Sequence, residues 1–306
     1  MIERFAVTDR DSWLAMRAQD LTASDIGAAV GVDPYKSRLA LYAEKTGLLM
    51  PQADNNAMRR GRWLESAVLA AIREENPDWE VRPAGIYLRD PDLRLGATPD
   101  ALAATDQPGV TNIQCKVVNR PSFERDWAAG PPLHYQLQTL TEGMLLRADQ
   151  SLIAALVIDT YSADLYLHPV PRHEAAEARV EAIAIRFWED VAAGRMPPVD
   201  YARDEETIAA LYPQSVPEPV LDLSADNRIH ELLDLRERLK VEQGNAEACL
   251  REVETEIKAK LGEHERATLP GWNISWKTQH RKESIVKAHD RRPLIITETA
   301  EKEQAA

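Results

Sequence analysis

The sequence predicts an α/β domain with a mixed central sheet flanked by helices, followed by an extension made of a long helix and a short β segment. Three observations support this prediction. Runs with strand-like alternation are interleaved with amphipathic helices through the first two thirds of the chain. Residues 111–118 place apolar side chains on both faces, as expected of a strand at the centre of a sheet. Beyond residue 223 the pattern changes to a long, highly charged amphipathic run.

The elements of the α/β domain follow from periodicity and from residues that begin or end regular structure. In residues 58–75, Leu64, Val68 and Ile72 recur at helical spacing, and Pro77 ends the run. The other expected helices cover residues 13–17, 22–31, 39–47, 133–146 and 174–193, and the expected strands cover 79–88, 93–98, 111–118, 151–159 and 163–170.

The composition changes along the chain predict its domain limits. We expect a first domain over residues 1–199 and, because the next stretch is polar and rich in proline, a linker over 200–223. Residues 224–306 form the helical and β extension.

The extension leaves two questions open. Its helical run, capped by Ser224, is either one amphipathic helix or a hairpin broken near Gly244, and its apolar stripe packs either on the first domain or on another subunit or partner. A strand is expected at residues 272–277. The basic segment 278–292 lies beside two tryptophans and is a candidate DNA contact.

Composition restricts the class of protein. The 306 residues are 44% apolar and 28% charged, which is ordinary for a soluble globular chain. No apolar run approaches the length of a membrane span and no signal peptide is recognisable, so we expect a cytoplasmic protein without a membrane partner. Two distant cysteines indicate a reduced protein without a zinc cluster. The net charge of −13 argues against a broadly basic, DNA-binding exterior, but basic residues inside a channel are compatible with it.

A carboxylate and a polar-x-Lys triplet suggest a site for phosphodiester chemistry. Asp100 follows a proline, and Gln114 and Lys116 lie fourteen and sixteen positions later. Alternate residues of a strand share a face, so Gln114 and Lys116 should project together while Cys115 points into the packed side. A turn-rich stretch between the two segments would return the second strand beside Asp100. Mg²⁺ prefers such oxygen ligands, and a nearby lysine can hold or deprotonate the attacking water.

These residues resemble the signature of the PD-(D/E)XK nuclease superfamily, in particular its lambda-exonuclease (YqaJ-like) branch. Thr98-Pro99-Asp100 corresponds to the Pro-Asp of the family, and Gln114-Cys115-Lys116 to its Glu-x-Lys. The resemblance implies a restriction-endonuclease-like fold in which Asp100, Gln114 and the backbone carbonyl of Cys115 bind the metal. The neutral Gln114 departs from the family, where this position is acidic. It is either a natural variant or a glutamate replaced to inactivate the protein.

Other segments extend the resemblance, which runs from Trp13 to about Ala193. Glu65 ends a Gly-x-x-x-Glu segment, and Gln136 matches the first glutamine of a Gln-x-Gln motif; both are implied to act beside Lys116. The remaining implied residues bind a terminal 5′-phosphate and are Arg17, Ser24 and Thr98. From the residues alone, a structural explanation is favoured: Glu65 and Gln136 as solvent-exposed helix positions, and Ser24 as the start of a helix.

The resemblance implies a Mg²⁺-dependent exonuclease, with Mn²⁺ as a substitute, that digests double-stranded DNA ends from 5′ to 3′. It would release mononucleotides, leave a 3′ overhang, form a homotrimer and work with a single-strand annealing protein. Because Gln114 lacks a charge, we expect weak or absent cleavage. Two alternatives stay open: a structure-specific endonuclease of the same superfamily, and a catalytically dead protein that binds DNA ends.

Overall fold

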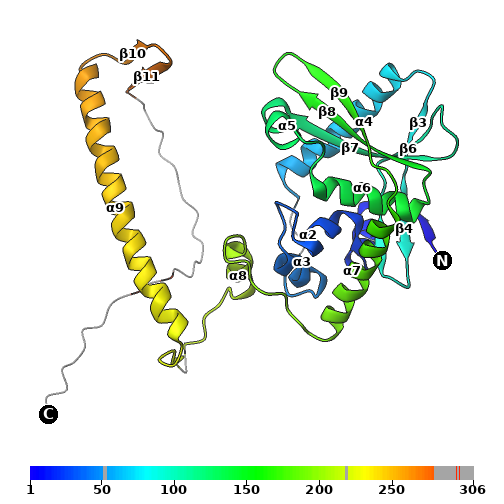
Figure 1. Cartoon of the computed structure of the whole chain (residues 1–306), viewed down its shortest axis with the longest axis horizontal. Coiled ribbons are helices and arrows are strands. Elements are labelled where there is room, and N and C mark those ends of the chain that lie inside the picture. The colour runs from blue at the N-terminus through cyan, green and yellow to red at the C-terminus, as the bar shows by residue number, and fades with distance from the viewer. Residues whose placement is uncertain (51–53, 218–219, 279–293, 295, 297–306) are drawn as a thin grey trace. The chain divides into compact units, whose positions relative to one another are not determined.

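The computed structural model describes residues 1–50, 54–217, 220–278, 294 and 296. It divides into two compact units, residues 1–212 and residues 213–306 (Figure 1).

The core of the first unit contains a mixed five-stranded sheet (Figure 1). Its strand order is β3-β6-β7-β8-β9, and only the β7–β8 pair is parallel. The strands are β3 Glu80–Pro83, β6 Ala101–Ala104, β7 Thr111–Asn119, β8 Gln150–Ile158 and β9 Ala163–Pro169. The predicted mixed sheet, with residues 111–118 in its central strand, is confirmed.

Helices α4 (Asn56–Glu75) and α6 (Leu133–Leu146) cover opposite faces of this sheet. One apolar cluster joins α4 to alternate residues of β7 and β8: Val68, Leu69, Ile72, Ile113, Ala154 and Leu156. Another joins α6 to the other set in β8: Leu140, Leu145, Ile153 and Ala155. Because side chains alternate along a strand, Gln114 and Lys116 lie on the α6 face, while Cys115 packs toward α4.

The first unit has a second, four-stranded sheet, whose strands lie before and after β3 in the chain. Its order is β1-β4-β5-β2, with β1 Glu3–Ala6, β4 Ile86–Asp90, β5 Leu95–Ala97 and β2 Leu21–Thr22. The single strand predicted over residues 79–88 is therefore wrong, because β3 and β4 belong to different sheets. The chain turns between them at Gly85, whose φ of 59° is available to glycine at little cost. It passes between the sheets again from β5 to β6, and Asp100 lies in that connection.

Helices complete the first unit around these sheets. The expected helix at 22–31 is divided into β2, the 3₁₀ turn η1 (Ala23–Asp25) and α2 (Ile26–Val30), and Gly31 ends it with φ 82° as predicted. The others are α1 Arg10–Gln19, α3 Arg38–Lys45, α5 Arg120–Asp126, α7 Glu174–Ala192 and α8 Glu205–Leu211.

Helix α8 lies within the stretch predicted to be a linker. The buried carboxylate of Asp204 accepts a hydrogen bond from Ser37 and another from the backbone N of Asp200 at 2.7 Å. Arg203 donates to the carbonyl oxygens of Asp33 and Lys36. The first unit therefore continues to Tyr212 rather than ending at residue 199.

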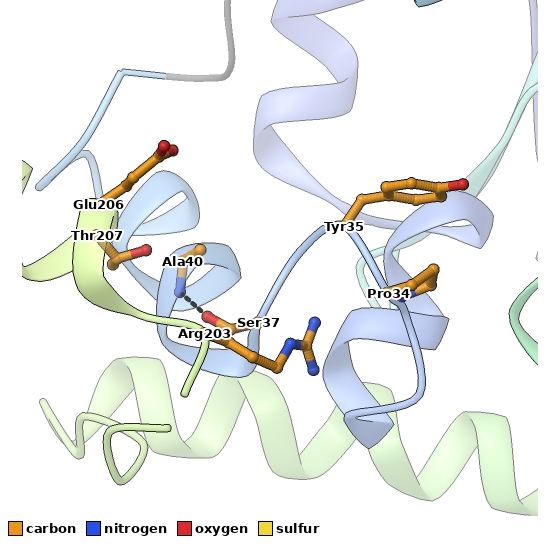
Figure 2. A pocket seen from close by; sticks show the side chains of 7 residues that line it. All are labelled: Pro34, Tyr35, Ser37, Ala40, Arg203, Glu206 and Thr207. Carbon is orange, nitrogen blue, oxygen red and sulfur yellow. Dashed lines mark hydrogen bonds between the residues drawn. The ribbon is translucent and has the colours of Figure 1, made fainter. Parts of the chain in front are cut away.

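These contacts border a polar pocket of about 230 Å³ between α8 and the turn before α3 (Figure 2). Its lining residues are Pro34, Tyr35, Ser37, Ala40, Arg203, Glu206 and Thr207. None of the predicted site residues lines it.

The second unit contains one long helix and a hairpin. Helix α9 (Asn227–Leu261) runs unbroken through Gly244, so the hairpin alternative for this stretch is wrong. Its N-cap is Asp226, whose side chain accepts from two backbone N–H groups, and not Ser224. Strands β10 (Arg266–Leu269) and β11 (Trp272–Ser275) pair across a turn at Gly271, which confirms the first part of the strand predicted at 272–277.

The basic segment and the membrane expectation concern parts of the chain that the structure describes unequally. Apart from its first residue, the basic segment 278–292 lies outside the described residues. Among the helices that the structure describes, none has the length and apolarity needed to cross a membrane.

Candidate active site

The connection into β6 and the strand β7 bring Asp100 and Gln114 together. The Asp100 carboxylate accepts a hydrogen bond from the backbone N of Cys115 at 2.8 Å and a short one from the side-chain amide of Gln114. The pairing of β6 with β7 produces this contact, because Ala101 lies opposite Ile113. The proximity that the spacing predicted is therefore present, whereas the chemical roles of these residues remain predictions.

Lys116 lies on the same face of β7 and contacts α6. Its Nζ donates to Oε1 of Gln138 at 3.2 Å and lies 4.5 Å from the centre of the Tyr135 ring. Gln138 in turn donates to Oε1 of Gln114 at 2.9 Å. Gln138 thus links the two polar residues of the predicted triplet.

Gln138 is a residue that the sequence reasoning missed, because the resemblance pointed to Gln136. The amide of Gln136 donates to the carbonyl of Pro131 at 2.5 Å instead. Residues two apart on a helix face directions about 200° apart, so only one glutamine of a Gln-x-Gln motif can face β7. The motif itself was the available signal, but it does not tell which glutamine faces inward.

Glu65 approaches the same cluster from α4. Burial raises the pKa of its carboxyl to about 7, the negative charge of Asp100 adds to this shift, and the positive charge of Lys116 opposes it. Burial also raises the pKa of Asp100, while Lys116 and the hydrogen bonds from Cys115 and Gln114 oppose the rise. Two partly buried carboxylates and one lysine thus influence each other electrostatically.

The available donors fit a divalent cation by their chemistry, with one negative charge fewer than the family pattern. Mg²⁺ takes oxygen ligands, commonly one or two carboxylates completed by carbonyl groups and water. Asp100 and Glu65 offer carboxylates, and Cys115 offers its carbonyl oxygen. Among the described residues there is no cluster of three or more acidic, histidine or cysteine ligands, so the set depends on these neutral oxygens.

The orientation of Gln114 limits its part in such a set. Its amide N–H₂ faces Asp100 and the Cys115 carbonyl, while its Oε1 is directed to Gln138. A cation bound by Asp100 would compete with this amide for the carboxylate. Gln114 would contribute an oxygen only after its amide turned.

A second polar cluster contains all three predicted phosphate-binding residues. Arg17 donates to Oγ of Ser24 at 2.9 Å and stacks on Trp13, with 4.7 Å between the guanidinium carbon and the ring centre. The indole N–H of Trp13 donates to Oγ1 of Thr98 at 2.9 Å. Thr98 is two residues before Asp100, so the chain itself connects this cluster to the carboxylate site.

A buried ion pair between Asp25 and Lys45 lies beside this second cluster. Asp25 accepts from the backbone N and the hydroxyl of Thr22, which forms a capping box at η1, and lies 2.9 Å from Nζ of Lys45. Burial raises the pKa of Asp25, but the charges of Lys45, Lys36 and Arg17 outweigh it and leave this pKa well below its usual range. The ionised Asp25 therefore fixes the turn that presents Ser24 to Arg17.

Comparison with solved structures identifies the class of fold. A solved structure of an alkaline exonuclease (LHK-Exo) from Laribacter hongkongensis superimposes with a TM-score of 0.51 at 22% sequence identity, covering 65% of this chain and 99% of that one. The class is therefore that of the α/β alkaline-exonuclease fold, as the sequence predicted.

Sequence comparison finds two further similarities. The profile of the YqaJ-like viral recombinase domain matches residues 12–143, a segment that contains both polar clusters. Protein YqaJ of Bacillus subtilis (strain 168) is 24% identical over 277 residues, covering 88% of this chain and 83% of that protein. Over residues 12–143 the chain is therefore similar to the YqaJ-like viral recombinase domain.

Proposed function

We propose that this chain is a Mg²⁺-dependent exonuclease that digests double-stranded DNA from a 5′ end. The observation that carries the proposal is that two polar clusters are joined by the short segment from Thr98 to Asp100. One cluster contains Asp100, Gln114, Lys116 and Glu65. The other contains Arg17, Ser24 and Thr98. The first has the groups for metal-assisted phosphodiester hydrolysis, and the second has the groups for a terminal phosphate.

Each side chain has a role in this proposal. Asp100, the Cys115 carbonyl, Glu65 and a turned Gln114 would hold Mg²⁺ or Mn²⁺, which would stabilise negative charge on the scissile phosphate. Lys116, held by Gln138, orients the attacking water or takes its proton. Arg17 and the hydroxyl of Ser24 hold the 5′-phosphate, so that an end is required and digestion would leave a 3′ overhang.

Digestion assays with matched substrates test the proposal. The substrates are a linear duplex with 5′-phosphates, the same duplex without them, and a closed circle, each with Mg²⁺ or with EDTA. We expect mononucleotides from the phosphorylated linear DNA only. Nicking of the circle would favour the structure-specific endonuclease instead.

The position of Gln114 favours a second candidate, a protein that binds DNA ends without cutting them. Its amide already occupies the Asp100 carboxylate. Comparing the chain with its Gln114→Glu variant separates the two candidates: digestion by either protein supports a nuclease, and end binding without digestion by both supports the second candidate.

The assembly and partner are proposals that the resemblance carries. A homotrimer is expected in solution, and light scattering measures it directly. A cytoplasmic single-strand annealing protein is the expected partner, since a 3′ overhang is its substrate.

A further inference from the structure

The cluster around Asp100 lacks the carboxylate that the resembled family has at position 114, and another buried acid lies nearby. Glu142, on α6, is only 1% exposed, and it is among the largest fully buried side chains of the described chain. Its Oε1 accepts a hydrogen bond from Nε2 of Gln138 at 2.9 Å, and the same Nε2 donates to Gln114. Acidic side chains are almost never so deeply buried without a compensating partner.

Two contacts fix the orientation of the amides around Glu142. Lys116 can only donate, so the oxygen of the Gln138 amide faces Lys116, and its N–H₂ faces Gln114 and Glu142. At the other end, the carbonyl of Thr139 can only accept, so the amide nitrogen of Asn112 faces it at 3.3 Å. The Asn112 side chain also interacts with the carboxyl of Glu142 and lowers its pKa.

Two buried oxygens in this region, Oδ1 of Asn112 and Oε2 of Glu142, have no hydrogen-bond donor within the part of the chain that the structure describes. Burial raises the pKa of Glu142 to about 8, the charge of Asp100 adds to the rise, and Gln138, Lys116 and Asn112 oppose it. A divalent cation would reverse this shift, because positive charge stabilises the carboxylate.

We propose that Glu142 supplies the cation site with the carboxylate that position 114 lacks, in addition to Asp100 and Glu65. The inference rests on the proposed metal-dependent function and deepens it. An amide stands on the strand at Gln114 and a carboxyl on the helix at Glu142, and Gln138 is hydrogen-bonded to both. On this account the chain keeps its affinity for the metal, contrary to the weak cleavage expected from position 114 alone.

The test relocates the carboxylate without changing the composition of the site. Binding of Mn²⁺ to the full chain is measured by calorimetry, without DNA, for the chain as it is, Glu142→Gln, Gln114→Glu and the double variant. Glutamine at position 142 keeps an oxygen that can accept the hydrogen bond from Gln138 and has nearly the same volume, so the substitution removes chiefly the charge. We expect Glu142→Gln to weaken binding by about tenfold or more, and the double variant to restore it to within about threefold.

A matched control removes a carboxylate elsewhere. Glu124 is exposed on α5, and Glu124→Gln should leave Mn²⁺ affinity unchanged. Thermal unfolding in EDTA shows whether each variant folds. Unchanged affinity in Glu142→Gln would overturn the inference. If that variant fails to fold, Gln114→Glu alone decides: tightening by more than about tenfold would mean that Glu142 does not supply the charge.

The design separates two failures. If Gln114→Glu and the unmodified chain both bind Mn²⁺ while Glu142→Gln binds as well as they do, only this inference fails. If no variant binds Mn²⁺, including the one that restores the family's glutamate, the proposed metal-dependent function fails and this inference fails with it.

Discussion

At the scale of single residues, the candidate site depends on which atoms of its amides face which neighbours. Lys116 orients Gln138, and Gln138 orients Gln114, whose N–H₂ then meets Asp100. The spacing predicted that Asp100, Gln114 and Lys116 converge, because strand alternation is a local property, and the resemblance to the nuclease family added Glu65. The sequence did not predict Gln138 or Glu142, because their positions depend on how α6 is rotated against β7.

Truncating the two glutamines of α6 separately tests this orientation. Gln138→Ala should lower the rate of DNA digestion by about 10-fold to 100-fold, because Lys116 loses its side-chain partner. Gln136→Ala, which removes a hydrogen bond to a backbone carbonyl, should have a smaller effect. A larger loss in Gln136→Ala would show that the side chain identified by the resemblance acts in the reaction.

The raised pKa values of the buried acids predict how stability depends on pH in EDTA. In the folded chain Glu142 has a pKa of about 8 and Glu65 of about 7, against 4.5 without the fold, so the folded state binds protons more tightly. Stability should therefore fall as pH rises from about 4.5 to about 8. The unfolding temperature of Glu142→Gln should fall less, with the difference from the unmodified chain accumulating over the whole range from about pH 4.5 to about 8. Parallel curves for both proteins would contradict this assignment.

At the scale of elements, local patterns predicted helices better than they predicted the arrangement of strands. The limits of α6 agree with the prediction because prolines and an apolar stripe define them. The run at 79–88 was predicted as one strand because its alternation continues across Gly85, although the chain changes sheets there. Helix α8 was missed because its anchoring contact joins Asp204 to Ser37, which is distant in sequence.

A substitution at that anchor tests whether α8 belongs to the first unit. Asp204→Ala leaves the buried hydroxyl of Ser37 and the backbone N of Asp200 without their acceptor, and should lower the free energy of unfolding by about 1–3 kcal/mol. The exposed Asp106, changed to alanine, is the matched control and should have little effect. Denaturant unfolding measures both. Equal, small effects would indicate that residues 200–212 behave as the linker that composition suggested.

At the scale of the whole molecule, the two units have different relationships to known proteins. The solved alkaline exonuclease is matched over 99% of its length by 65% of this chain. The alignment with Bacillus subtilis YqaJ covers 88% of the chain, which is more than the first unit contains, so it reaches into the second. The solved structure thus matches a smaller share of the chain than this relative does. Apolar residues along α9 are exposed in this structure. They are therefore compatible with both predictions for this helix, packing on the first domain or on another subunit or partner.

The most direct test of the account is Mg²⁺-dependent release of mononucleotides from 5′-phosphorylated linear duplex DNA, comparing this chain with Lys116→Ala. The account predicts release by the unmodified chain, none in EDTA, and a loss of about 100-fold or more in the variant, because the water at the metal loses its positioning group. Equal digestion by the two proteins, or digestion that persists in EDTA, would contradict it.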